Sequence, residues 1–383
     1  MNLPVRLFIK SRDGLLAFGP EHARMPLPWG LDRGGPVLTY GPYLNALASF
    51  LGQSDYQPLR TALSRLLGRP ISLPEVQDLE VISQKHGAFY HVAQARAKIS
   101  GEYYSLAINS AVRTEQQAFL ESEFTLLQHL NKRFPLGLIP RTFALGISPY
   151  AAEDGSVLAL KSFIAEWFDG YHEFHLSRRS LNEIPVVKVW DGSSGETALD
   201  AQQTRLLYHR AAAILTAYLD GESFSQIYPW HHAAGDFVLA RREQGVEVRL
   251  ITVRGYQPLV SVGSDPSEKW IPLVHFFLNM SLRMRLDRLD GTGDLAWAGV
   301  ECLQGVVSGF LECWEQKARE NSSLPRSSEV WGVLRSFARE EWLSLAELVL
   351  VDGLLEEDET EFIQPRLEEH VTSLCRVLSD EGV

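Results

Sequence analysis

Histidine and acidic side chains gather in two short windows of the sequence. The first reads Tyr171-His-Glu-Phe-His175, and the second reads Trp230-His-His-Ala-Ala-Gly-Asp236. An imidazole titrates near neutral pH, so a histidine in either window can act as a general base. Imidazole together with carboxylate also suits zinc, iron or manganese, which makes His172, His175 and Asp236 candidate metal ligands. The windows therefore point to acid–base or metal chemistry.

Both windows also have purely structural explanations. His172, Glu173 and His175 can cap the first helix of a carboxyl-terminal lobe, and His231 and His232 can order a loop by hydrogen bonding to its backbone. No H-E-x-x-H spacing is present, which weakens the metal interpretation. The sequence leaves catalytic, metal-binding and structural roles open for these side chains.

The composition of the chain indicates an acidic globular protein. Hydrophobic residues make up 45% of the 383 residues and charged residues 22%, which is enough to bury a large core. The net charge of −12 argues against a broad nucleic-acid surface or an anionic membrane face as the principal partner. We expect a small-molecule ligand or a protein partner instead.

Neither the cysteines nor the amino terminus indicates a secreted or membrane protein. Three cysteines without a C-x-x-C pair argue against a disulfide framework and against a thiolate zinc site. No apolar run approaches the roughly 18 residues that a membrane span needs. Charges interrupt the opening stretch MNLPVRLFIKSRDG, where a signal peptide would be apolar. We predict a cytoplasmic protein.

The pattern of apolar residues divides the chain into three parts. Residues 1–77 form an accessory region with two helical patterns. Residues 78–168 read as three strands, a helix over residues 114–134 and two further strands, with turn residues between them. Residues 169–383 are mostly helical, with a hairpin over residues 237–253. The sequence therefore predicts an α+β protein.

Two charged stretches near the carboxyl end are expected to lie in solvent. The acidic run Glu356-Glu-Asp-Glu359 predicts an exposed loop. Arg283, Arg285 and Arg288 are interleaved with leucines, which predicts an amphipathic helix with a cationic face.

This order of elements resembles the protein-kinase-like fold, and in particular its small-molecule phosphotransferase branch of the aminoglycoside and choline type. The resemblance covers residues 80–370 and rests on element order more than on motif identity. It implies two lobes, an antiparallel-sheet N-lobe over residues 78–168 and a mainly helical C-lobe over residues 169–383, with an extra N-terminal region. It also implies a nucleotide between the lobes, held as ATP with Mg²⁺ or Mn²⁺, and both histidine windows are expected to face that cleft.

The residues that hold nucleotide phosphates in this fold are only partly matched. The strand that carries a phosphate-binding lysine in the family reads Leu106-Ala-Ile-Asn109, so the amide Asn109 replaces the cation. Glu123 matches the glutamate of the following helix, and Lys98 on the preceding strand is a candidate substitute cation. Glu166 lies in the segment that resembles the hinge.

The catalytic loop and its metal ligands are matched less well. If Phe237-Val-Leu is the strand after the loop, Asp236 takes the place of the metal-binding asparagine and His231 that of the catalytic aspartate. A second alignment, which we prefer less, makes Asp236 the catalytic aspartate and leaves the asparagine without a match. Thr252 takes the position of the other metal-binding aspartate. Phosphoryl transfer depends on such positioned charges, so we do not expect ordinary kinase activity.

Three functions are open on this sequence. The first is a pseudokinase that binds a nucleotide, a small acidic ligand or a protein partner. The second is an unconventional ATP-dependent transferase in which His231 or His232 is the general base, while Asp236 and Glu123 hold a metal. The third is a metal-dependent enzyme of another kind that uses the histidine–aspartate cluster. Of the three, we predict the pseudokinase.

Overall fold

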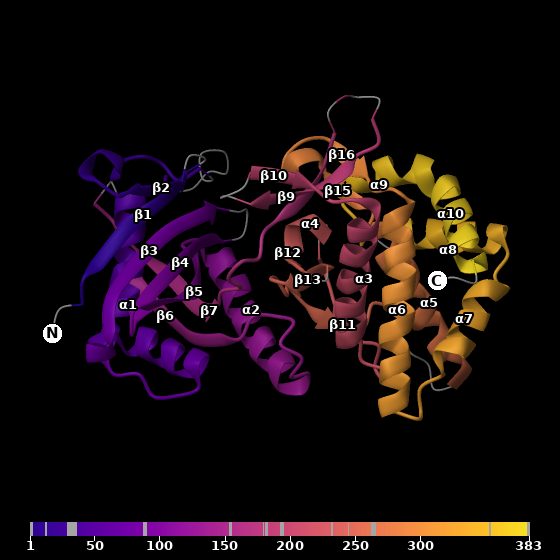
Figure 1. Ribbon diagram of the computed structural model, residues 1–383, viewed down its shortest axis with the longest axis horizontal. Helices are drawn as coiled ribbons and strands as arrows, with labels where there is room; N and C mark the ends of the chain where they lie inside the picture. Colours follow the sequence, from indigo (N-terminus) through magenta and orange to yellow (C-terminus); the bar gives the residue numbers. More distant parts are fainter. Residues whose placement is uncertain are drawn as a thin grey trace. The chain divides into compact units, whose positions relative to one another are not determined.

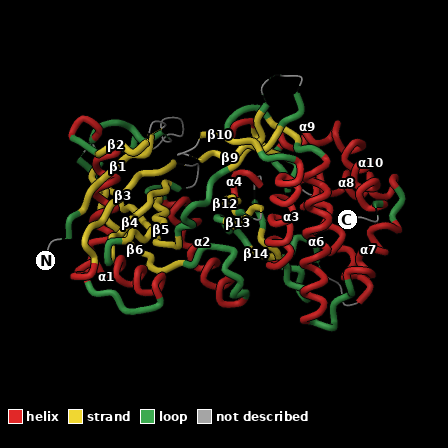
Figure 2. The backbone as a smooth tube through the Cα atoms, viewed as in Figure 1, coloured by secondary structure: helices red, strands yellow, loops and turns green. Residues whose placement is uncertain are grey.

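The computed structural model describes most of the chain. The described residues are 3–11, 14–28, 37–86, 90–152, 155–178, 180, 183–191, 195–230, 233–243, 245–261, 266–351 and 354–380. The chain divides into two compact units, Met1–Asp169 (unit 1) and Gly170–Val383 (unit 2). Unit 1 combines a large sheet with helices, and unit 2 is richer in helix (Figures 1 and 2). The α+β class predicted from the sequence is confirmed.

A mixed seven-stranded sheet forms the centre of unit 1. Among its described pairs, the first strand and the third are parallel and the other neighbours are antiparallel. The spatial order of the strands is β2 (Gly14–Ala17), β1 (Val5–Ser11), β3 (Val76–His86), β4 (His91–Ile99), β5 (Glu102–Ala111), β7 (Val157–Glu166) and β6 (Thr142–Ala151).

Helix α1 (Tyr40–Leu67) covers one face of this sheet. Its regular geometry is interrupted at Gln53–Tyr56, which is why the sequence shows two separate helical patterns. The leucine and aromatic side chains of α1 share a buried core with alternate residues of the strands, such as Leu79, Ala95 and Leu106. The amino-terminal region is therefore part of the same core as the strands that follow it.

Helix α2 (Thr114–Arg133) packs against the opposite face of the sheet, over β5 and β7. The Phe124 ring lies 5.8 Å from the ring of Phe163 on β7, measured between centroids. The side-chain amide of Gln117 donates to the carbonyl oxygens of Val112 and Ala159, at 2.8 and 2.7 Å. These contacts place α2 over the part of this face formed by β5, β7 and β6.

Unit 2 opens with a small antiparallel sheet of β8 (Phe174–Ser177), β9 (Val186–Asp191) and β10 (Gly195–Ala198). The sequence patterns did not predict these short strands. Helix α3 (Ala201–Tyr218) follows, and a capping box at Asp200 begins it. It packs lengthwise against α6 (Val300–Glu320), as Figure 1 shows.

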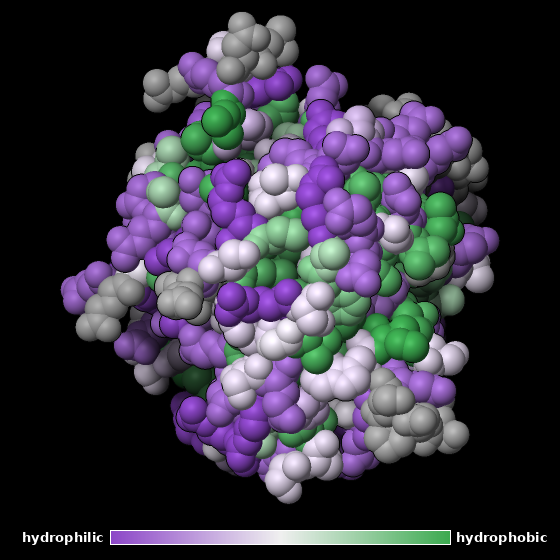
Figure 3. Space-filling view, turned by 90° about the vertical axis from the view of Figure 1, so that its right-hand side faces the viewer, coloured by the Kyte–Doolittle hydropathy of each residue, from purple (hydrophilic) through white to green (hydrophobic). Residues whose placement is uncertain are grey.

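The rest of unit 2 consists of short strand pairs and a group of helices. The predicted hairpin is present, formed by β12 and β13. On the side that carries α7, α8 and α10, apolar areas lie between hydrophilic ones (Figure 3). The elements are β11 (Gln226–Ile227), α4 (Ala233–Asp236), β12 (Phe237–Arg242), β13 (Gly245–Leu250), β14 (Tyr256–Gln257), α5 (Trp270–Arg283), β15 (Leu286–Arg288), β16 (Leu295–Trp297), α7 (Ser327–Ser336), α8 (Arg339–Val351), α9 (Glu357–Ile363) and α10 (Leu367–Ser379).

The charged stretches near the carboxyl end are only partly solvated, since Glu356, Glu357 and Asp358 are exposed as predicted but Glu359, Arg283 and Arg285 are buried. The acidic run leads into α9, where Glu359 is buried with Arg283 at 3.9 Å and Asp358 accepts from Arg288 at 2.6 Å. Arg285 is also buried and contacts Glu369 on α10. The predicted loop is a helix, and the prediction of a cationic face was wrong, because the buried arginines pair with acidic residues of the last helices and bring those helices against α5 and β15.

Within the described residues, every helix is too short or too polar to cross a membrane.

Candidate functional site

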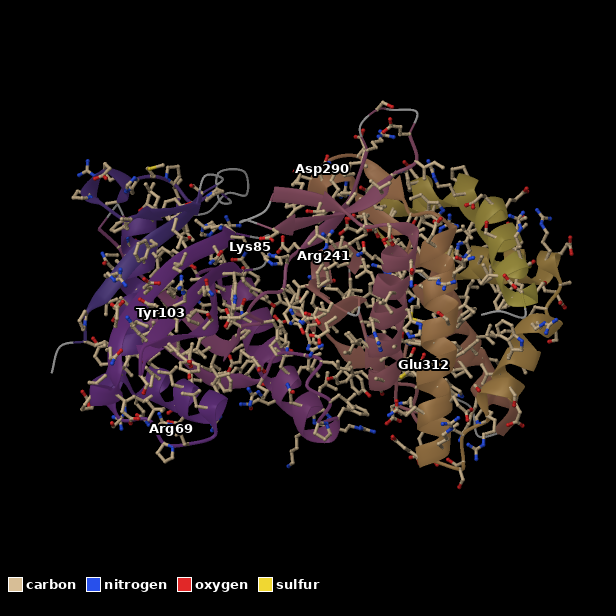
Figure 4. The ribbon with its side chains drawn as sticks, in the orientation of Figure 1. Arg69, Lys85, Tyr103, Arg241, Asp290 and Glu312 are labelled. Atoms are coloured by element: carbon tan, nitrogen blue, oxygen red, sulfur yellow. The ribbon has the colours of Figure 1, made fainter. Side chains whose placement is uncertain are left out.

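The sheet of unit 1 has a polar face on the side opposite α1. Side chains alternate across a strand, so alternate residues of β3, β4 and β5 point away from the apolar core. We call this surface the polar face. It includes Asn109 on β5, and Figure 4 labels Tyr103 on the same strand. Its central members are Asp78, Glu80, Gln94, Arg96, Lys98, Tyr103, Ser105, Ala107 and Asn109.

One end of the polar face is an ion-pair network. Arg6 donates to the carboxylates of Asp78 and Glu80, the latter at 2.7 Å. The Tyr103 hydroxyl donates to Asp78 at 3.2 Å, and the Arg96 guanidinium lies 3.4 Å from Glu80 and 4.7 Å from the Tyr103 ring centroid. These cations are engaged by carboxylates of neighbouring strands, so this end stabilises strand pairing.

The centre of the polar face is lined by uncharged hydrogen-bonding groups. Gln84 donates to Gln94 at 2.9 Å, and Gln94 donates to the Ser105 hydroxyl at 3.1 Å. Asp169 lies beside this chain: burial raises the pKa of its carboxyl group, while hydrogen bonding from Ser105 and the charge of Arg96 oppose that rise. Amide and hydroxyl groups of this kind recognise a polar ligand without supplying a net charge.

Asn109 and Lys98 lie far apart on the polar face. Asn109 is opposite Val92 in the β4–β5 register, whereas Lys98 is opposite Tyr103. Six residues of strand separate Val92 from Lys98, which is about 20 Å. The Lys98 ammonium instead lies 5.6 Å from the Tyr103 ring centroid. The structure therefore does not bring Lys98 next to Asn109 as a substitute cation.

The two predicted glutamates differ in their surroundings. Glu123 is only 3% exposed and lies on the side of α2 that also buries Leu120 and Leu127, so it belongs to the surface of α2 that packs on the sheet. Both oxygens of Glu166 accept from the Arg141 guanidinium at 2.9 Å. Glu123 is thus a buried carboxylate beside the polar face, and Glu166 is the partner of an arginine.

Asp236, the acidic residue of the second window, is held in unit 2 by an arginine. The Arg254 guanidinium donates to the two oxygens of its carboxylate at 2.9 and 2.8 Å, and Asp236 is 1% exposed. Its backbone carbonyl accepts from the Ile251 amide at 2.8 Å. The sequence analysis missed this pairing, although Arg254 follows Thr252 by two residues in the segment that was searched for a metal ligand.

Thr252 lies in the same segment, between the amide that binds the Asp236 backbone and the arginine that binds its side chain. His231 and His232 lie outside the described residues. The residue before them, Trp230, is buried, and its carbonyl accepts from Arg283 at 2.7 Å. The loop that leads into the second window is therefore anchored by a buried arginine.

The histidines of the first window have separate partners. His172 pairs through its backbone with Leu239, and its ring lies 3.9 Å from Asp191. The His175 ring lies 3.4 Å from the buried carboxylate of Asp287 and 4.8 Å, between centroids, from the Trp190 ring. These contacts join β8 to its neighbours.

The donor set does not fit a metal-assisted phosphoryl transfer. In the described part of the chain, no group of three histidine, cysteine or acidic side chains is arranged to hold a metal ion. Asp236 is engaged by Arg254, Thr252 offers no carboxylate, and Asn109 offers no cation. Among the described residues, the phosphate-binding lysine and the second metal-binding carboxylate that the resemblance implies therefore have no equivalent at Asn109 and Thr252.

No protein-family model matches this sequence, and no curated protein matches it at a significant level.

Proposed function

We propose that this protein is a kinase-like binding protein, a pseudokinase, that takes up a small ligand on the polar face and does not transfer phosphate. Unit 1 has the order of three strands, a helix and two strands that the resemblance implies. Asn109 and Ala107 are part-exposed on the polar face, and the buried Glu123 lies on the neighbouring helix. These features support a ligand site of the kinase kind.

The observation that carries the proposal is the buried Asp236–Arg254 pair. The Asp236 carboxylate accepts two guanidinium hydrogen bonds from Arg254 and is only 1% exposed, so its charge is already compensated and it is shielded from solvent. A metal ion at Asp236 would have to compete with the arginine that already neutralises this carboxylate. This arrangement disfavours the transferase in which Asp236 holds a metal and favours a binding function.

The ligand is proposed to be a nucleoside or nucleotide, bound through hydrogen bonds more than through phosphate charge. The centre of the polar face carries the part-exposed amide of Asn109 and the buried, mutually hydrogen-bonded Gln94 and Ser105, and the arginines at its end already hold carboxylates. Uncharged donors and acceptors favour a heterocyclic base and a sugar over a multiply charged phosphate.

Calorimetric titration of ATP and of adenosine, with and without Mg²⁺ or Mn²⁺, tests this function. We expect both ligands to bind, metal to change the affinity by less than about threefold, and no nucleotide to be consumed. Ala107→Trp should weaken binding at least about tenfold because the indole would fill the part-exposed position on the polar face.

Ala17→Trp, on the exposed edge strand β2, is the matched control and should bind as the wild type does. Metal-dependent binding that Asp236→Asn abolishes, or hydrolysis of ATP, would favour the transferase over the pseudokinase. Absence of binding by either ligand would overturn the nucleotide site and leave a protein partner as the ligand.

A further inference from the structure

Two buried histidines meet where β3 and β4 approach their connection in unit 1. His86 ends β3, His91 begins β4, and the two are direct partners in the antiparallel register. Their Nδ1 atoms are 2.8 Å apart, and the residues are only 7% and 6% exposed. Figure 4 labels Lys85, the residue before His86, at this end of the strand. Two imidazoles this close to each other and this well shielded from solvent need a chemical explanation.

The geometry is that of a hydrogen bond rather than of a metal site. The two ring centroids lie 5.0 Å apart, much farther than the two Nδ1 atoms, so each nitrogen points at the other ring. A shared metal would require both lone pairs to converge on a third point instead. One ring must therefore carry a proton on Nδ1 and donate it to the bare Nδ1 of the other ring.

The surroundings of the pair are aromatic and weakly polar. From α1, the Tyr40 ring approaches the edge of His86, and the Tyr43 ring approaches both histidines at centroid distances of 5.7 Å. From β3, the Ser83 hydroxyl contacts Nε2 of His86 at 3.0 Å. In the described part of the chain, the buried Tyr43 hydroxyl has no hydrogen-bond partner, and no carboxylate is among these contacts.

The charges that act on the pair disfavour its protonation. Burial lowers the pKa of His86 to about 3, and the nearby His91 adds to this effect. Burial lowers the pKa of His91 to about 4, and the Arg113 guanidinium at the end of β5 contributes in the same direction. The phenols of Tyr40 and Tyr43 face the pair from α1 and are neutral in this range. Both imidazoles are therefore neutral at physiological pH.

We propose that the His86–His91 pair is a proton-sensitive latch that fastens the β3–β4 end against α1 while both rings are neutral and releases it when they are protonated. A proton on the accepting Nδ1 places two N–H groups against each other, so the hydrogen bond is lost and charge enters an aromatic pocket. Opening the strand end to water relieves both effects. The latch does not depend on ligand binding to the polar face.

The sign of the pH effect follows from the lowered pKa values. The opened form titrates near the ordinary histidine value of about 6.5, and the closed form takes up protons only near pH 4 and below. Between these limits the opened form binds more protons, so acid favours opening. The equilibrium constant for opening should rise by up to about tenfold for each ring when the pH falls by one unit. For the pair, the rise should be up to about a hundredfold.

Amide hydrogen exchange of the full-length wild-type chain between pH 7 and pH 4.5 measures this opening. After correction for intrinsic exchange rates, we expect the amides of residues 83–86 and 91–94 to lose protection as the pH falls. The logarithm of their opening constant, plotted against pH, should have a slope that approaches two protons. The amides near Lys98 and Tyr103, at the other end of the same strands, should change much less. A uniform loss of protection along both strands would contradict a local latch.

Variants and ring tautomers provide the decisive comparison. His86→Gln and His91→Gln should each reduce the slope to at most one proton, whereas His129→Gln, on the exposed side of α2, should leave it unchanged. Nitrogen NMR of the wild type at pH 7 should find opposite tautomers on the two rings, one protonated at Nδ1 and the other at Nε2. The same tautomer on both rings, or a slope that neither variant changes, would overturn the latch, and the tautomer measurement needs no variant to fold.

Discussion

Replacing Arg254 by methionine is expected to lower the free energy of unfolding by about 3–5 kcal/mol. The methionine fills much of the same space but leaves the Asp236 carboxylate buried without the two hydrogen bonds that it accepts from the guanidinium. Urea unfolding followed by circular dichroism measures the effect, and tryptophan fluorescence provides a second probe because most of the nine tryptophans belong to unit 2.

Two further variants distinguish the loss of this buried pair from the general effect of losing an arginine. Arg141→Met breaks a pair with Glu166 that has the same two-pronged geometry, but the Arg141 side chain is 44% exposed, so we expect a loss of about 0–1 kcal/mol. The double variant Asp236→Leu/Arg254→Met removes both charges and should recover most of the loss. Equal effects of Arg254→Met and Arg141→Met would contradict our account of Asp236.

Gly309→Ala is expected to lower the free energy of unfolding by about 3 kcal/mol or more. A Cβ atom at this position of α6 would lie 2.1 Å from the carbonyl oxygen of His209 on α3 and 2.9 Å from its Cα atom. Both neighbours are helix backbone, so neither can rotate away and the two helices must separate. Gly305, one turn earlier, meets the carbonyl of Arg205 in the same manner, at 2.3 Å.

Gly332→Ala is the matched control for the effect of replacing glycine by alanine within a helix. Gly332 lies in α7, where an added Cβ would have no atom within 4 Å. Alanine has the higher helix propensity, so this variant should gain about 0.5–1 kcal/mol. The difference between the two variants in urea unfolding isolates the contact between α3 and α6. A gain for Gly309→Ala as well would show that these helices are not packed as closely as described.

The Asp236–Arg254 pair also bears on the choice between binding and catalysis. If Asp236 had been free at the start of the β12–β13 hairpin, the transferase would have been the stronger proposal. Arg254 neutralises it, and the same short segment carries Thr252 where a second carboxylate would be needed. Under the proposed binding function, substitutions at these positions should change stability rather than turnover.

Several features of the fold could be predicted from local sequence. The strands β3, β4, β5 and β7 and the helix α2 follow from alternating or helical apolar spacing and from turn residues such as Ser100-Gly101. The β12–β13 hairpin follows for the same reason. Each of these elements has one apolar side, and the residues on that side recur at the spacing of a helix or a strand. Local spacing is therefore enough to predict the element.

Other features could not be predicted in this way. The strands β8, β9 and β10 are four to six residues long, too short for their spacing to differ clearly from that of a loop. Strand β1 pairs in parallel with β3, some seventy residues later, and no local pattern specifies that partner. In the site, the distance between Lys98 and Asn109 depends on the β4–β5 register, which is set by packing of the whole sheet.

The sequence by itself determined which side chains are available: histidines in two windows, an asparagine where the resemblance expects a lysine, and a threonine where it expects an aspartate. Only the tertiary structure decided what those side chains do. It paired Asp236 with Arg254, buried Arg283 and Arg285 beside acidic residues of the last helices, and joined His86 to His91. The physical reason is that burying a charged or polar group is costly unless it has a partner, and here the partners of these charged groups come from segments that pack against them and are distant in the chain.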